Sequence, residues 1–324
     1  KHLRAQGNKI TVLANRYDKE VLSSFADQIV DIPTSDADYY NLNEFTADWL
    51  KKNWNNIFPK QLPDLVFIGG WPFFTAIKNF NELNIPTVFF DCGAVPMDKF
   101  EGGGLAIQQK VRKLRKENLK YLSHIISISD FIANTQSRLD TNGLVPITTI
   151  YLGVDHLDES VWVNEKREKT TFDLKIKKLR NKFDGLIFNL GRWEAENYKN
   201  SNASLRILRR LRNQGVNCCL IILDKSENIN IPLDLKEVVV PIGFPDDEEL
   251  LVLMQEVDIG LSVSKWEGFN FPLAEMQWIK KTVFVFNIGA HPEVVVHPWF
   301  LCADELEMTK KVFNFFTAKR LDKD

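Results

Sequence analysis

The sequence lacks a strong charge of either sign, a long apolar run and a paired cysteine motif. Lys and Arg number 41 against 43 Asp and Glu, and this near balance leaves no global field to attract nucleic acid or a membrane. No apolar run reaches the roughly 18–20 residues of a membrane span, and no signal peptide is visible. The four cysteines form no CxxC pair, so we expect reduced, buried thiols in a cytoplasmic protein.

What is present is a globular composition, with 44% hydrophobic and 26% charged residues. The 324 residues exceed one ordinary core and suit two domains of roughly 150 residues each. Short β-rich runs alternate with helical patterns, and most are continuously apolar, as in parallel strands buried on both faces. The predicted strands lie at 10–15, 64–70, 87–91, 124–129, 148–153, 185–191, 218–223, 237–243, 258–264 and 282–287.

This alternation, repeated twice, predicts an α/β protein with two Rossmann-like, doubly wound domains. We expect an N-terminal domain over 1–157, a charged linker over 158–184, a C-terminal domain over 185–305 and a C-terminal helix over 306–324. Because the chain opens on a helix end, the first domain is expected to lack its first strand. Two such domains facing each other make a cleft at the carboxyl ends of their strands, where ligands bind.

The stretch SKWEGFNFPLAEMQ (264–277) follows one predicted strand and opens a helix. Pro272 suits the first helical turn, and the backbone N–H groups just before it would form an anion site, particularly for phosphate. Glu275 could accept two hydrogen bonds from a ribose diol, while Glu267 would lie toward the group attached to the phosphates. Spacing leaves an alternative open: Glu275 complements the helix dipole and Glu267 is a surface acid.

A second loop, FNLGRWEAENYKN (188–200), also lies at the carboxyl end of a predicted strand. Gly191 precedes Arg192, and both Arg192 and Lys199 could reach a diphosphate there. Such charged hydrogen bonds are worth roughly 1.5–3 kcal/mol each. The alternative is that both cations are ordinary surface residues.

These two motifs together resemble the donor-binding domain of the retaining glycosyltransferases of family four (group 1), which have the GT-B fold. NIGAHPEVV (287–295) and IYLGVD (150–155) resemble further segments of that family. The resemblance covers most of residues 120–305 and is specific in the second half of the chain.

The resemblance implies a role for each matching residue. Arg192 and Lys199 would hold the donor diphosphate, with Gly191 before them. Glu267 would lie near the transferred sugar and Glu275 on the ribose. The backbone of the loop that follows Glu267 would face the phosphates and the sugar; its residues are Gly268, Phe269 and Asn270.

The sequence departs from the family pattern at several positions. Asn197 stands where the family's Lys is commonest, and Leu152 replaces the usual Asn. Asp91 stands where the family often has a His that contacts the transferred sugar; an Asp could hydrogen-bond a sugar hydroxyl. His291, in a loop, is a candidate ligand contact. Trp71 could stack on an acceptor sugar, or could equally be a core residue.

We therefore expect a hexosyltransferase that moves a sugar from a nucleoside diphosphate to a glycan or lipid-linked acceptor, with retention, in polysaccharide biosynthesis. The resemblance implies no metal and no cofactor besides the donor substrate, and no DxD motif is present in the donor region. We expect no nucleic-acid partner. The basic run at 110–120 is a solvated helix face or, alternatively, a peripheral contact with anionic lipid or a lipid-linked acceptor.

Two other classes of function stay open at this stage. One is a non-catalytic GT-B module that binds a nucleotide sugar or glycan within a larger protein. The other is a dinucleotide-binding oxidoreductase, although no GxGxxG follows an opening strand. The sequence leaves the donor base, the sugar, the acceptor and the oligomeric state undetermined, because a fold limits reaction class rather than substrate.

Overall fold

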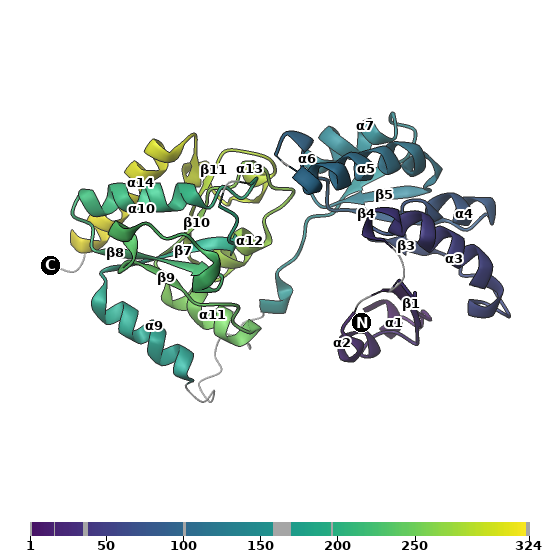
Figure 1. Cartoon of the computed structure of the whole chain (residues 1–324), viewed down its shortest axis with the longest axis horizontal. Coiled ribbons are helices and arrows are strands. Elements are labelled where there is room, and N and C mark those ends of the chain that lie inside the picture. The colour runs from purple at the N-terminus through teal and green to yellow at the C-terminus, as the bar shows by residue number, and fades with distance from the viewer. Residues whose placement is uncertain are drawn as a thin grey trace. The chain divides into compact units, whose positions relative to one another are not determined.

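The structure is a computed structural model that describes residues 2–15, 17–34, 38–99, 102–157, 170–195 and 197–321. The chain divides into two compact units, coloured by residue number in Figure 1. The first unit comprises 1–94, 102–127 and 133–149. The second comprises 95–101, 128–132 and 150–324. Residues 158–169 of the predicted linker lie outside the described residues, and the rest of that stretch largely forms a helix.

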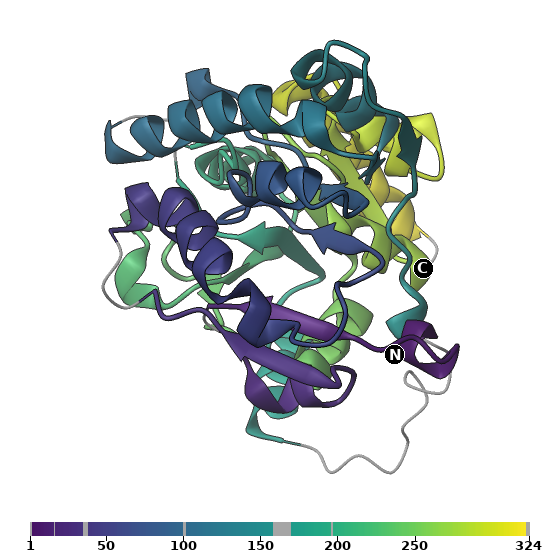
Figure 2. The ribbon, with the colours of Figure 1, turned by 90° about the vertical axis from the view of Figure 1, so that its right-hand side faces the viewer.

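The first unit contains two parallel sheets, one of two strands and one of four in the order β3-β4-β5-β6. The two-stranded pair is seen in purple in Figure 2. The strands are β1 (Thr11–Ala14), β2 (Gln28–Asp31), β3 (Val66–Ile68), β4 (Thr87–Asp91), β5 (His124–Ser127) and β6 (Ile147–Thr149). The helices are α1 (His2–Ala5), α2 (Lys19–Ser23), α3 (Leu42–Ile57), α4 (Ala76–Glu82), α5 (Gly102–Asn118) and α7 (Arg138–Asp140).

Helix α3 shows how this unit buries its core. Its buried residues recur every three or four positions, so one stripe of the helix faces inward. Leu50 and Trp54 of that stripe join Phe80 of α4, Phe89 of β4 and Ile125 of β5 in one apolar cluster. The cluster anchors β4 and β5, whose carboxyl ends carry the buried polar residues Asp91 and Ser127.

The second unit contains one six-stranded parallel sheet in the order β12-β11-β10-β7-β8-β9. Its strands are β7 (Gly185–Arg192), β8 (Cys218–Leu223), β9 (Val239–Pro241), β10 (Ile259–Ser262), β11 (Thr282–Phe286) and β12 (Leu301–Cys302). Its helices are α6 (Asp130–Ile132), α9 (Thr171–Lys182), α10 (Asn202–Asn213), α11 (Asp247–Glu256), α12 (Phe271–Trp278), α13 (His291–Val294) and α14 (Glu305–Leu321).

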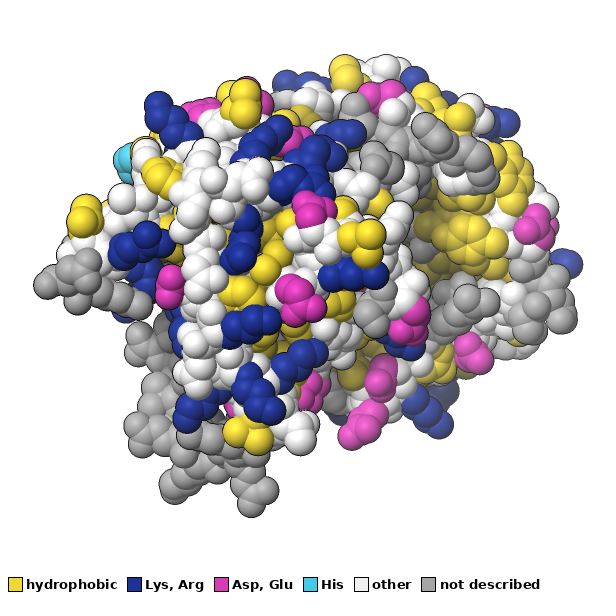
Figure 3. Space-filling view, turned by 60° about the vertical axis from the view of Figure 1, so that its left-hand side comes forward, with side chains coloured by type: hydrophobic (Ala, Val, Ile, Leu, Met, Phe, Trp, Pro, Cys, Tyr) yellow, Lys and Arg dark blue, Asp and Glu magenta, His cyan; other side chains and the backbone are white. Residues whose placement is uncertain are grey.

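The central strands of this sheet are buried on both faces. In Figure 1, α10 and α14 lie above the sheet, whereas α9 and α11 lie below it. Helix α14 approaches β7 closely because Gly185 has no side chain, since a Cβ there would lie 2.6 Å from the Phe316 ring. Arg206 and Arg210 of α10 bond to Glu305 at 2.7 and 2.9 Å. On the face that Figure 3 shows, basic and acidic side chains are interspersed.

All the predicted strands are present, and the predicted α/β fold class is confirmed. Strands β2 and β12 were not predicted, because β2 has only two apolar residues between exposed polar ones and β12 has only two residues, so neither gives a continuous apolar run. The expectation of buried thiols is right for Cys218, Cys219 and Cys302, where burial raises the pKa to about 12. It is wrong for Cys92, which is exposed.

Candidate functional site

The second sheet reverses its direction of winding between β7 and β10. From β7 the chain proceeds outward to β8 and β9, and from β10 it proceeds the other way to β11 and β12. Loops that leave two neighbouring parallel strands in opposite directions leave a crevice at the carboxyl ends, and open α/β sheets bind their ligands there. The predicted motifs 188–200 and 264–277 lie at the carboxyl ends of β7 and β10: the first includes the end of β7, and the second includes the start of α12.

Lys199 and Glu267, 68 positions apart in the sequence, form a direct ion pair between these loops. The Lys199 Nζ lies 2.8 Å from Glu267 Oε1, and the Ser264 hydroxyl donates to the same oxygen at 2.7 Å. The side chains of Lys199 and Glu267 are only 17% and 9% exposed. The Lys265 N–H donates to the Tyr198 carbonyl at 2.6 Å, which joins the two loops through the backbone as well.

Arg192 is the last residue of β7, and its side chain is largely exposed. Its guanidinium donates to Glu194 at 2.5 Å and to the Tyr198 hydroxyl at 3.2 Å. Burial by itself would lower the pKa of Arg192, but Tyr198 and Glu194 hold it above its ordinary value. Gly191 has φ +85°, and a Cβ on it would lie 3.9 Å from the Lys199 Nζ. The backbone at Gly191 therefore runs beside the Lys199 ammonium.

Helix α12 begins at Phe271 without a side-chain cap. Asn270, at the N-cap, has the left-handed φ of 72° and makes no capping hydrogen bond. Its amide donates instead to Ser262 Oγ at 2.9 Å and to His291 Nε2 at 2.8 Å. The first-turn N–H groups of α12 are therefore not occupied by a capping side chain, as an anion site at a helix N-terminus requires.

His291 is completely buried and both its ring nitrogens bond to protein atoms. Nδ1 lies 2.7 Å from the Phe286 carbonyl, so Nδ1 carries the proton and Nε2 accepts from Asn270. Burial lowers the pKa of His291, which keeps the ring neutral. This arrangement fixes Asn270, whereas a direct contact between His291 and a ligand stays a prediction.

Gly289 brings the loop after β11 against the backbone of Glu267. Gly289 has φ +54°, and a Cβ on it would lie 2.3 Å from the Glu267 carbonyl oxygen. The Ala290 N–H donates to that same carbonyl at 3.0 Å. Only glycine fits this position, so the segment NIGAHPEVV acts on the site by fixing the Glu267 loop.

Glu275 lies further along α12 and pairs with a residue that the sequence analysis did not identify. Its Oε1 is 2.9 Å from His156 Nε2, and the His156 ring stacks on Phe271 at 5.3 Å with an angle of 15°. Burial raises the pKa of Glu275, and His156 opposes that rise. His156 lies 119 positions from Glu275 in a short turn, and no local pattern marked it.

The remaining residues of this region contact residues 129–131 and Tyr151 of the same unit. The Ser129 hydroxyl donates to the Gly268 carbonyl at 2.7 Å. The Phe269 ring lies 6.4 Å from the Tyr151 ring. The Glu293 carboxylate accepts from the N–H groups of residues 130 and 131, each at 2.7 Å. These contacts place Gly268 and Phe269 beside Glu267 at the switch point.

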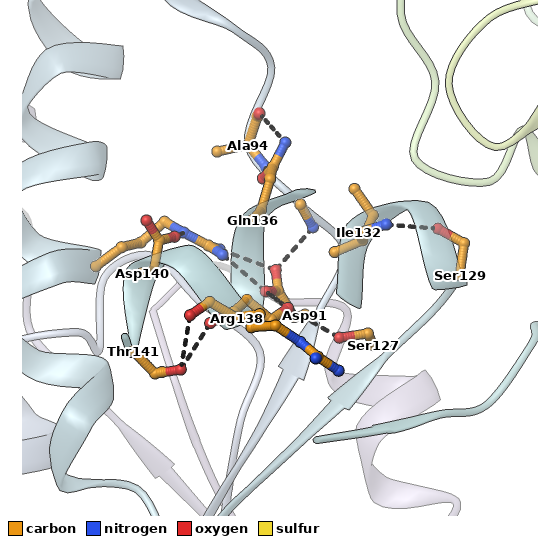
Figure 4. Close-up of polar contacts among 12 residues, drawn as sticks. Asp91, Ala94, Ser127, Ser129, Ile132, Gln136, Arg138, Asp140 and Thr141 are labelled. Atoms are coloured by element: carbon orange, nitrogen blue, oxygen red, sulfur yellow. Dashed lines mark hydrogen bonds and ion pairs between the residues drawn. The ribbon is translucent and has the colours of Figure 1, made fainter. Parts of the chain in front are cut away.

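Asp91 is fully buried at the carboxyl end of β4 (Figure 4). Its carboxylate accepts from both terminal nitrogens of Arg115 at 2.8 and 2.7 Å, from Ser137 Oγ at 2.7 Å and from the Gly93 N–H at 2.8 Å. Burial by itself would raise the pKa of Asp91, but Arg115 holds it below the ordinary value. Four donors use the carboxylate's usual acceptor capacity, so this geometry is that of a structural ion pair. The proposed sugar contact stays a prediction.

Trp71 packs at the edge of the first unit's core, 5.5 Å from the Tyr39 ring. Its Nε1 is buried and has no hydrogen-bond partner among the described residues. Contact of Trp71 with an acceptor also stays a prediction.

The basic run at 110–120 is not uniformly exposed. Lys110 bonds to Glu44 at 2.9 Å and to the Tyr40 carbonyl, and Arg115 is buried against Asp91. Of the other cations of this run, Lys113, Lys116 and Lys120 are exposed, and Arg112 is half-buried. Among the helices of the described chain, none is both long and apolar enough to cross a membrane. The described residues also contain no group of three or more His, Cys, Asp or Glu that could hold a metal ion.

Comparison with known proteins establishes the fold. No protein-family model matches the sequence, and no curated protein matches it. Among solved structures, the chain is similar to sucrose-phosphate synthase from Thermosynechococcus elongatus, with 11% identity and a TM-score of 0.70 over 97% of this chain and 81% of that one. A glycosyltransferase from Rickettsia africae has 16% identity and a TM-score of 0.63 over 98% and 82% of the two chains.

HepE from Anabaena, solved in complex with UDP, has 14% identity and a TM-score of 0.65 over 98% of this chain and 91% of HepE. These structures have the GT-B fold, and the chain belongs to this fold class with its two Rossmann-like domains. At such identities the similarity extends to the fold alone.

Proposed function

We propose that the chain is a retaining glycosyltransferase that moves a sugar from a nucleoside diphosphate to a glycan or lipid-linked acceptor without a metal. The observation that carries the proposal is the pairing of Lys199 with Glu267 at the switch point of the second sheet. The crevice there has two cations, an uncapped helix start and two half-buried or buried carboxylates. This combination suits a diphosphate joined to a ribose and a sugar.

Arg192 and Lys199 would stabilise the departing diphosphate. An ammonium has three donors and a guanidinium five. Lys199 gives one to Glu267, and Arg192 gives bonds to Glu194 and Tyr198, so donors remain on each for phosphate oxygens. Such donors lower the barrier when they face the position where negative charge develops. The N–H groups at the start of α12 would add to the same field.

Glu267 would orient the sugar, and the acceptor supplies the nucleophile. The bond between the anomeric carbon and the phosphate oxygen breaks, and a bond from that carbon to the acceptor oxygen forms on the same face. The acceptor proton passes to an oxygen of the leaving phosphate. Glu275 would accept from the ribose diol. We assign this reaction to polysaccharide biosynthesis in the cytoplasm, and the UDP in HepE makes UDP the first nucleotide to test.

The test is calorimetric titration of UDP, GDP and ADP, with EDTA present, into the wild type, Arg192→Ala and Lys113→Gln. We expect micromolar binding of one nucleotide, at least tenfold weaker in Arg192→Ala (about 1.4 kcal/mol) and unchanged in Lys113→Gln. Turnover of the matching nucleotide sugar, with the product anomer assigned by NMR, then tests transfer and retention. Absence of binding by every nucleotide to the folded protein would rule out the donor site.

A second candidate is a non-catalytic module that binds a nucleotide sugar. The buried pairing of Asp91 with Arg115 favours it, because Asp91 stands where the resembling family often has a sugar-contacting His. The transferase is expected to turn over a nucleotide sugar, whereas the non-catalytic module is not. Nucleotide binding with neither transfer nor hydrolysis of the sugar, across a panel of acceptors, would support the module.

A further inference from the structure

The first unit has a small hollow between α5 and the segment 135–140. It encloses about 100 Å³, far below the ~300–1,000 Å³ of pockets that take whole ligands. It therefore suits one chemical group at the end of a larger molecule. Three cations of α5 line it: Arg112, Arg115 and Lys116.

The positive charge of this hollow is only partly neutralised. Arg115 donates to Asp140 at 2.5 Å and to Asp91, so two carboxylates use its charge. Arg112 and Lys116 form no ion pair with any residue that the structure describes. Asp140 is the one carboxylate in the lining, and it is already bonded to Arg115. The remaining charge at the hollow is therefore positive.

Arg112 also carries a polar atom without a partner. Its Nε is buried and has no hydrogen-bond acceptor among the described residues. Buried donors in native proteins are nearly always paired, so this guanidinium N–H is available to an acceptor that the described residues do not supply.

The wall of the hollow is held in place by the chain itself. The Gln136 side chain accepts from the Ala94 N–H at 2.6 Å and donates to the Ala94 carbonyl at 2.8 Å (Figure 4). The Arg115 guanidinium is clamped between Asp91 and Asp140. A group that enters the hollow therefore meets preorganised walls and two adjustable cations.

We propose that this hollow binds the phosphate group of a ligand through Arg112 and Lys116. A guanidinium and an ammonium side by side are a recurring phosphate-binding pair. In naming that ligand the proposal rests on the proposed function: the phosphate belongs to the acceptor, which is a soluble sugar phosphate or a lipid-linked phosphate.

The experiment is titration of glucose 6-phosphate, glucose and farnesyl phosphate, observed by NMR and calorimetry. Wild type, Arg112→Gln, Lys116→Gln, Arg192→Ala and the matched control Lys113→Gln are compared; Lys113 lies on the same helix, 71% exposed. We expect a phosphate ligand to bind at least tenfold more tightly than glucose. The affinity should fall at least tenfold in Arg112→Gln and Lys116→Gln, and stay unchanged in Lys113→Gln and Arg192→Ala.

Binding of glucose 6-phosphate indicates a soluble acceptor, and binding of farnesyl phosphate alone indicates a lipid-linked one. Absence of both, or loss in Arg192→Ala but not in Arg112→Gln, overturns the proposal. Thermal unfolding of each variant shows that it folds. Titrating the nucleotide into Arg112→Gln distinguishes the two proposals. If the donor-site proposal fails, nucleotide binding is absent, whereas the phosphate binding that depends on Arg112 is retained.

Discussion

At the scale of single residues, the site depends on backbone positions that tolerate one residue type. Gly289 combines a positive φ with direct contact to the Glu267 carbonyl. Asn270 takes a left-handed φ and uses its amide to join Ser262 and His291. These positions fix where Glu267 and the start of α12 lie.

Replacing Gly289 with Ala is expected to abolish the geometry around Glu267. The left-handed backbone costs about 1–2 kcal/mol with a Cβ, and the Cβ would also displace the Glu267 carbonyl at 2.3 Å. We expect nucleotide affinity to fall at least tenfold, measured by calorimetry. Gly215→Ala is the control: Gly215 has φ +82° but no atom within 4 Å of an added Cβ. Equal affinities in the two variants would contradict the assigned role.

Asp91→Asn tests the buried ion pair of the first unit. Removing the Asp91 charge leaves the buried Arg115 with Asp140 as its remaining carboxylate partner, and breaking a buried ion pair typically costs about 3–5 kcal/mol. We expect a loss of that order in the free energy of unfolding at pH 7, measured with urea. The double variant Asp91→Leu with Arg115→Met should lose less than Asp91→Asn by itself.

The same pair gives a pH dependence of defined sign. The pKa of folded Asp91 lies below its ordinary value, so its contribution is present above the unfolded pKa of about 3.9. It is lost as the pH falls through the folded pKa. Wild type should therefore lose stability below about pH 4 more steeply than Asp91→Asn; parallel curves would argue against the pair.

At the scale of elements, α12 and α5 each carry charged residues whose roles differ by burial. Glu275 on α12 is buried against His156, and its pKa is raised chiefly by that burial. Lys110 and Arg115 of α5 serve the fold, whereas Lys113 of α5 and Lys120, in the turn Leu119–Tyr121 that follows it, are exposed.

Glu275→Gln should separate binding from stability. A raised folded pKa means that stability is complete below the unfolded pKa of about 4.3 and is lost as the pH rises through the folded pKa. At pH 7 the variant should therefore unfold at the same or a higher temperature. Its nucleotide affinity should nevertheless fall about tenfold or more, while Glu256→Gln, an exposed acid on α11, keeps the affinity of the wild type.

The exposed cations Lys113 and Lys120 of the basic run at 110–120 allow a test of the predicted membrane contact. If the membrane contact exists, the double variant Lys113→Gln/Lys120→Gln should bind anionic vesicles up to about 30-fold more weakly, because each basic residue contributes roughly 1 kcal/mol. Co-sedimentation with anionic and neutral vesicles measures it. Lys177→Gln with Lys178→Gln on α9 is the matched control. Equal sedimentation of both double variants would argue against α5 as the contact.

At the scale of the whole molecule, each unit has an apolar core of its own. The candidate donor site lies entirely in the second unit, and the candidate phosphate hollow entirely in the first. Different ligands should therefore leave different footprints on the chain.

Hydrogen exchange with the cognate nucleotide is expected to show where it binds. Protection should rise in 189–195, 197–200, 263–275 and 288–292, because these loops meet at the switch point. Residues 104–118 of α5 should be unaffected at the same ligand concentration. Protection confined to α5 would place the nucleotide elsewhere and contradict the donor site.

The sequence by itself determined the strands and the two motif loops. Runs such as CCLIIL (218–223) are apolar throughout because they are buried on both faces, and that pattern is local. Pro272 and Gly268 before it mark the start of α12 for equally local steric reasons. The local sequence pattern did not reveal the order of the strands, and so it did not reveal the switch point at which Lys199 meets Glu267.

Only the tertiary structure decided which distant residues meet. His156 with Glu275, Arg115 with Asp91 and Gly289 with Glu267 are pairs separated by 119, 24 and 22 positions. Each depends on packing of distant segments, which sequence spacing does not encode. Burial and partners then determine the chemistry of each carboxylate. Asp91 is a structural ion-pair partner and Glu275 is a candidate ligand-binding residue, because the groups around them differ.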